Sequence, residues 1–139
     1  MLAIDTNLVV RYLTADHPTQ SARARTIIED NEVFIGTTVL LETEWVLRRV
    51  YGFSSAQFND AVRGLAGLPT VTLEDPVLVG NALEWLTNGM DFADAIHLAK
   101  ASHCDGFVTF DRQFVRTAKM LGLAKVRTPP LHKTRSKSR

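Results

Sequence analysis

The sequence predicts an α/β protein in which helices cover both faces of a central parallel sheet of four or five strands. Short apolar segments alternate with helical patterns along all 139 residues. Strands that alternate with helices form right-handed crossovers, which make the strands parallel and place helices on both sides. At 45% apolar and 22% charged residues, the composition is typical of a globular protein. We therefore expect one three-layer α/β/α domain at residues 1–127, followed by a basic C-terminal tail at residues 128–139.

Four short apolar segments are predicted to be strands, and a fifth is a possible last strand. In chain order they are residues 2–4, 33–35, 70–73, 107–110 and 125–127. Apolar segments this short, bounded by cap and turn residues, are consistent with strands that are buried on both faces.

Helical periodicity predicts seven helices between these strands. They cover residues 8–13, 19–30, 37–51, 55–65, 77–86, 92–103 and 112–121. Ser54 and Asp91 stand at predicted N-caps, and Gly122 stands at a predicted C-cap. The His17-Pro18 pair is expected to separate the first two helices.

The remaining bulk features favour a cytoplasmic protein that has no membrane association. Cys104 is the single cysteine, so there is no intrachain disulfide, in agreement with a reducing compartment. No segment approaches the roughly 20 apolar residues of a membrane span. The first residues lack the basic and apolar regions of a signal peptide.

The net charge of +1 is unevenly distributed along the chain. Residues 1–124 hold 10 basic and all 15 acidic residues, a net charge of −5, whereas residues 125–139 hold six basic residues and no acid. A basic segment can follow a phosphate backbone by non-specific attraction, but a solvated chain terminus can have the same composition. Both interpretations of the tail stay open.

Two acidic residues directly follow predicted strands, Asp5 after the first and Asp111 after the fourth. In open parallel sheets the carboxyl ends of the strands form one edge, and ligands bind there. Each of these acids also fits a purely structural role, because an aspartate at a helix N-cap accepts hydrogen bonds from free backbone N–H groups.

Three further acids lie on or beside apolar helix faces. In helical projection Asp94 falls between Leu98 and Ala101, on the face that should be buried. Carboxylates are seldom fully buried without a partner or a metal, although the helix dipole also favours an acid in the first turn. Glu42 and Glu44 share one helix, and the periodicity does not choose between them.

Several acids that converge at one sheet edge would need a counterion, because like charges raise one another's pKa values. Mg²⁺ or Mn²⁺, which prefers oxygen ligands, meets that need and can promote phosphodiester hydrolysis. The chain offers no rival site: the histidines lack zinc spacing, Cys104 has no CxxC partner, and no glycine-rich phosphate loop is present.

Four motifs in order resemble those of PIN-domain nucleases. They are residues 5–7, 40–49, 91–95 and 109–111, and the resemblance extends over residues 1–127. Within that family, the chain most resembles the compact bacterial toxin branch, the VapC-like ribonucleases of type II toxin–antitoxin pairs.

The resemblance implies which residues form the site. The catalytic and metal-binding acids would be Asp5, Glu42, Asp94 and Asp111, so it selects Glu42 over Glu44. Thr6, Asn7 and Thr109 match supporting positions, and Asp91 is interpreted as a helix cap. The implied activity is hydrolysis of RNA phosphodiesters with Mg²⁺ or Mn²⁺ by metal-activated water. The implied partners are RNA, a cognate antitoxin and a second copy of the chain in a homodimer.

Two other functions are weighed against the toxin. A PIN-type nuclease of RNA processing would have the same motifs and no toxicity. A metal-binding, receiver-like interaction module is disfavoured, because it needs adjacent acids after the first strand and Asp5 is followed by Thr6 and Asn7.

Overall fold

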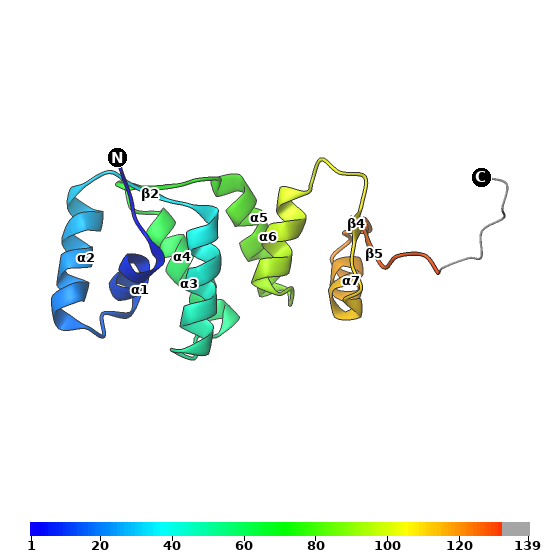
Figure 1. Cartoon of the computed structure of the whole chain (residues 1–139), viewed down its shortest axis with the longest axis horizontal. Helices are drawn as coiled ribbons and strands as arrows, with labels where there is room; N and C mark the ends of the chain where they lie inside the picture. Colours follow the sequence, from blue (N-terminus) through cyan, green and yellow to red (C-terminus); the bar gives the residue numbers. More distant parts are fainter. Residues whose placement is uncertain (132–139) are drawn as a thin grey trace, which may run out of the picture.

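The computed structural model of the chain describes residues 1–131 and has the alternation of strands and helices expected from the sequence (Figure 1). The strands are β1 (Leu2–Ala3), β2 (Val33–Ile35), β3 (Val71–Leu73), β4 (Phe107–Val108) and β5 (Val126–Arg127). The helices are α1 (Thr6–Thr14), α2 (Pro18–Asp30), α3 (Thr37–Arg49), α4 (Ser55–Ala66), α5 (Pro76–Thr87), α6 (Phe92–Lys100) and α7 (Arg112–Met120). The α/β fold class is therefore confirmed. Most of the predicted basic tail, residues 132–139, lies outside the described part.

Hydrogen bonds divide the strands into two sheets, both parallel. β2 lies between β1 and β3 in one sheet, and β4 pairs with β5 in the other. The predicted parallel direction is confirmed, but the described residues form a three-stranded and a two-stranded sheet in place of a single sheet of four or five strands. Ladders between strands of two or three residues hold few hydrogen bonds, and β4 pairs with the strand that follows it through α7, as consecutive strands often do.

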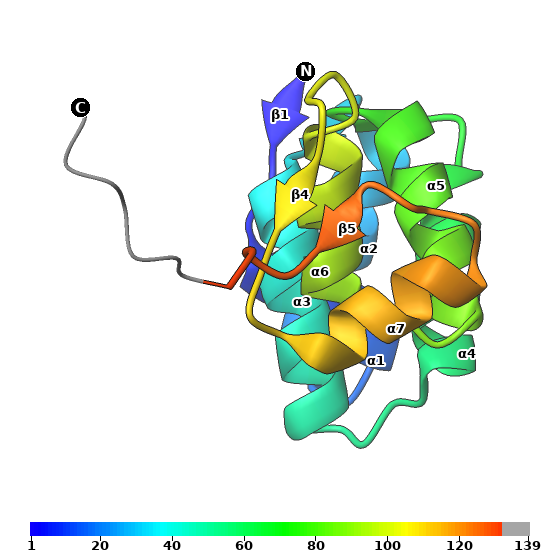
Figure 2. The same ribbon diagram turned by 90° about the vertical axis from the view of Figure 1, so that its right-hand side faces the viewer.

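This division affects where the acids lie. Asp5 follows β1 in the larger sheet, whereas Asp111 comes after β4 in the smaller one. Figure 2 shows β4, β5 and α7 together at one end of the molecule, in front of α6. The shared sheet edge on which the sequence argument relied is thus split between two sheets.

The helices pack in neighbouring pairs around an apolar core. α1 contacts α2 and α3, and α5 contacts α4 and α6. Phe92, which opens α6, is fully buried and meets Phe58 of α4 edge to face, with ring centroids 5.0 Å apart. This contact fixes the start of α6, the helix that carries Asp94.

Predicted N-caps are confirmed, and one was missed. Ser54 forms a capping box with Gln57 at the start of α4, and Asp91 caps α6. His17 was expected only to break the chain, yet its Nδ1 atom accepts a hydrogen bond from the Gln20 backbone N–H at 3.1 Å and caps α2. Histidine is not among the residues preferred at N-caps, so the sequence pattern did not predict this cap.

The N-terminus of α3 is capped from a distant part of the chain. Gly36 offers no capping side chain, and the Glu74 carboxylate accepts the Thr37 backbone N–H at 2.9 Å instead. Glu74 directly follows β3, so this bond ties the end of the larger sheet to the helix that carries Glu42 and Glu44. The contact lowers the pKa of Glu74 below its usual value.

Among residues 1–131, no helix combines the length and apolar character needed to cross a lipid bilayer.

Candidate functional site

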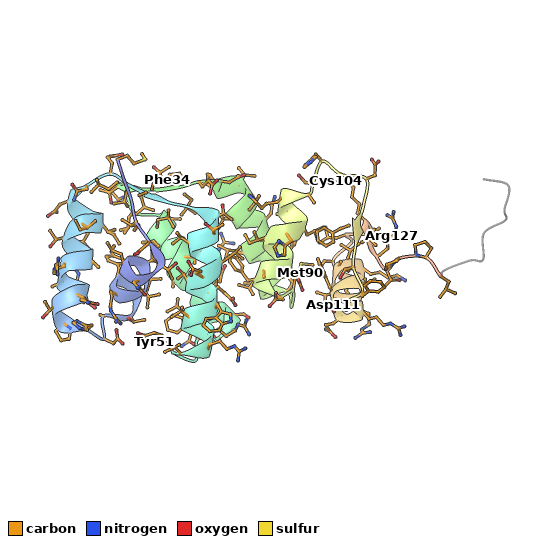
Figure 3. The ribbon with its side chains drawn as sticks, in the orientation of Figure 1. Phe34, Tyr51, Met90, Cys104, Asp111 and Arg127 are labelled. Carbon is orange, nitrogen blue, oxygen red and sulfur yellow. The ribbon has the colours of Figure 1, made fainter. Side chains whose placement is uncertain are left out.

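A cleft of about 500 Å³ lies between α3, α6 and α7 and gathers four carboxylates. Its lining includes Glu44, Asp91, Asp94 and Asp111, with Arg48 as a lining cation. Figure 3 labels two of the lining residues, Met90 just before α6 and Asp111 just before α7. Two of the four acids predicted for the site, Asp94 and Asp111, are therefore in one cleft.

Asp94 is the acid most strongly affected by this environment. Its pKa is raised above the usual value, first by partial burial and then by the negative charges of Asp91 and Asp111, while His97 acts in the opposite direction. Partial burial and like charges both disfavour ionisation of a carboxyl group. Asp91 and Asp111 are thus close enough for their charges to act on Asp94.

Helix capping places two of these carboxylates. Asp91 Oδ2 accepts the Asp94 backbone N–H at 3.2 Å, and Asp111 Oδ1 accepts the Phe114 N–H at 3.1 Å. Thr109 Oγ1 in turn accepts the Asp111 backbone N–H at 3.0 Å. The capping role considered from the sequence is confirmed, and it is compatible with a ligand role because a cap uses one carboxylate oxygen and leaves the other.

The other two predicted acids, Asp5 and Glu42, lie together near the first turn of α1. Asp5 Oδ1 accepts the Leu8 N–H at 3.2 Å as the cap of α1. The adjacent Thr6 hydroxyl donates a hydrogen bond of 2.9 Å to Glu42 Oε1 on α3. Both carboxylates are solvent-exposed. Asn7, the remaining predicted position of this motif, lines a separate hollow between α1 and α2.

Glu44, which the family resemblance passed over in favour of Glu42, lines the cleft, whereas Glu42 does not. Glu44 is only 8% exposed, and its Oε2 atom accepts a hydrogen bond from Arg48 Nε at 3.0 Å. The spacing of the two residues by one helical turn, with the acid first, is the sequence signal that could have identified this pair. The position of Glu44 in the cleft depends on how α3 packs against α6.

The donor atoms fit Mg²⁺ or Mn²⁺ in kind, since these ions prefer carboxylate oxygens. Their arrangement does not yet make a full site: within residues 1–131 no three side chains of His, Cys, Asp or Glu are placed to hold one ion. Of the predicted acids, Asp94 and Asp111 line the cleft, whereas Asp5 and Glu42 are not among its lining residues. Metal binding by all four therefore stays a prediction.

Comparison with models of known families identifies the family of the chain. A family model described as the PIN domain matches residues 2–120. PIN domains are in general metal-dependent nucleases, hydrolases that act on nucleic acids. A search of curated proteins finds no significant match.

Proposed function

Because the chain belongs to the PIN domain family, we propose that it is an endoribonuclease that hydrolyses RNA phosphodiesters with Mg²⁺ or Mn²⁺. The observation that carries this proposal is the aspartate cluster in the cleft. Partial burial, and then the charges of the neighbouring Asp91 and Asp111, raise the pKa of Asp94 above its usual value. Neighbouring carboxylates of this kind are suitable ligands for a divalent cation.

Each predicted site residue has a role in this proposal. Asp5, Glu42, Asp94 and Asp111 would hold the cation, which when bound supplies a Lewis acid that activates water and offsets phosphate charge. The Thr6 hydroxyl orients Glu42 through its 2.9 Å hydrogen bond.

Two positions have supporting roles next to these acids. Thr109 accepts the Asp111 N–H and so fixes the turn before α7. Asn7 lies in the first turn of α1, two residues after Asp5, and would help to shape that turn.

Cleavage by the purified full chain tests the activity. We expect cleavage of structured RNA with Mg²⁺ or Mn²⁺, none with EDTA, and none with Asp94→Asn. Asp60→Asn is the matched control, because Asp60 is an exposed aspartate of α4 outside the cleft. Cleavage that persists in EDTA, or in Asp94→Asn at the wild-type rate, would show that the site is wrongly assigned.

We further propose that the protein is the VapC-like toxin of a type II toxin–antitoxin pair and acts in the cytoplasm. The motif resemblance at residues 5–7, 40–49, 91–95 and 109–111 supports this role. The expected partners are a cognate antitoxin and a second copy of the chain. The exposed apolar residues Trp45, on α3, and Val50, directly after α3, offer surface for such contacts.

A PIN-type nuclease of RNA processing is the alternative. Induced expression separates the two: a toxin arrests growth, Asp94→Asn abolishes the arrest, and co-expression of a small protein encoded directly upstream relieves it. Normal growth under strong expression of the active chain would favour the processing enzyme.

A further inference from the structure

A hollow of about 670 Å³, separate from the cleft, lies beside α7. We call it the α7 groove; its walls are Phe110, Arg112, Val115 and Arg116 with residues 128–131. Figure 2 shows the chain after β5 passing the segment that joins β4 to α7, and both segments contribute residues to the α7 groove. A cavity of this size is in the range of ligand-binding pockets.

An exposed aromatic ring marks one wall of the α7 groove. Phe110 is 86% exposed, although phenylalanine is among the residues most often buried. It lies after the end of β4 and directly before the cap of α7, so its position is set by two regular elements. An accessible aromatic face of this kind is suited to stacking on a nucleic-acid base.

Two arginines flank the ring. Arg112 and Arg116 are exposed and lie one turn apart on α7. Neither is in an ion pair with the part of the chain that the structure describes, where the pairs are Arg11–Asp16 and Arg48–Glu44. Arg116 Nη2 donates only to the neutral Gln113 Oε1 within this set, at 2.9 Å. Both guanidinium groups are therefore available for an anion.

The α7 groove adjoins the acid cleft. Asp111 stands between Phe110 and Arg112 in sequence; it lines the cleft, while its two neighbours line the groove. Because residues 1–124 carry a net charge of −5, a polyanion needs a local cluster of cations to approach the carboxylates. The arginines of α7 are such a cluster.

We propose that the α7 groove binds a single-stranded segment of RNA next to the cleavage site. Phe110 stacks on a base, and Arg112 and Arg116 contact phosphates. The inference rests on the proposed function for the identity of the nucleic acid. Base pairs in a duplex are already stacked on one another, so the ring selects an unpaired base. An acidic peptide could contact the same arginines, but it has no planar base to use the exposed ring.

Fluorescence anisotropy with the full chain in EDTA tests the groove separately from cleavage. The probe is a labelled oligouridylate, compared with an RNA hairpin stem of equal length. We expect tighter binding of the oligouridylate, and about tenfold weaker binding by Phe110→Ala, from the known contribution of one base-stacking ring. Phe110→Tyr keeps the wild-type affinity. Met120→Ala, at another exposed apolar residue of α7, is the matched control and should bind like wild type.

The salt dependence of binding tests the arginines. Each phosphate contact to a single strand contributes about 0.7 to the slope of log affinity against log salt concentration. Arg112→Gln/Arg116→Gln should therefore reduce the slope by about 1.4. Arg23→Gln/Arg25→Gln on α2 removes the same charge from the opposite end of the molecule. This control variant should preserve most of the slope.

Three results would overturn the inference: wild-type affinity of Phe110→Ala, equal affinity for the stem, or tighter binding of a polyglutamate peptide than of RNA. The proposed nuclease function fails differently. In that case the protein does not cleave RNA with Mg²⁺ or Mn²⁺, yet oligouridylate binding in EDTA still depends on Phe110.

Discussion

The Glu44–Arg48 pair leads to the prediction that removing the cation alone destabilises the fold more than removing both charges. The Glu44 side chain is 10% exposed and the Arg48 side chain 48% exposed, with 3.0 Å between Nε and Oε2. Arg48→Met keeps much of the side-chain length but leaves the glutamate charge without its cation. The Glu44→Gln/Arg48→Met variant removes both charges.

The burial of the two partners sets the expected magnitude. Loss of one partner costs about 3–5 kcal/mol for a fully buried pair and about 0–1 kcal/mol for a surface pair. Since Glu44 is nearly buried and Arg48 is half-exposed, we expect Arg48→Met to lower the free energy of unfolding by about 1–2 kcal/mol. The double variant should be closer to wild type, because no buried charge is left unpaired.

Urea unfolding followed by circular dichroism measures the free energy of unfolding of the wild type, of Arg48→Met and of the double variant. Arg63→Met is the matched control: Arg63 is an exposed arginine of α4 whose side chain donates to the neutral Asn59, so we expect a change within about 0.5 kcal/mol. The reasoning is refuted if Arg48→Met is as stable as wild type, or if the double variant is less stable than Arg48→Met.

Three further predictions follow from individual contacts. Asp94→Asn should raise the thermal stability of the metal-free protein near neutral pH, because the raised pKa of Asp94 means that its ionised form destabilises the fold. That gain in stability should disappear as the pH falls through the folded-state pKa of Asp94. With saturating Mn²⁺ the variant should instead be less stable than wild type. An equal gain at neutral and acid pH would contradict the raised pKa of Asp94. Glu74 has a lowered pKa in the folded protein. Its contribution to folding stability is therefore present above its unfolded-state pKa and is lost as the pH falls through the folded-state value. Glu74→Ala should accordingly lower the melting temperature at neutral pH but not at acid pH, with Glu84→Ala, at an exposed glutamate of α5, as control. Phe92→Ala should cost about 3–5 kcal/mol in urea unfolding, since the side chain is fully buried against Phe58, and a cost under about 1 kcal/mol would mean that this packing is wrong.

Local features of the sequence were sufficient for the element order and most helix ends. The predicted caps at Ser54, Asp91 and Asp111 form because a cap depends on its own side chain and a backbone N–H three residues later. The motif at residues 5–7 likewise identified the turn after β1. Element ends were less exact: α6 ends at Lys100 rather than near residue 103.

Only the tertiary structure decided how these elements meet. It divides the strands between two sheets, puts Glu44 into the cleft, joins Glu42 to Thr6, and caps α3 with Glu74. Each of these outcomes depends on residues that are distant in sequence and on the few hydrogen bonds that two-residue strands can form. The sequence alone determined which carboxylates belong to helix starts and strand ends, because those positions are set by local backbone geometry. Their grouping into a cleft is a property of packing, which no local pattern contains.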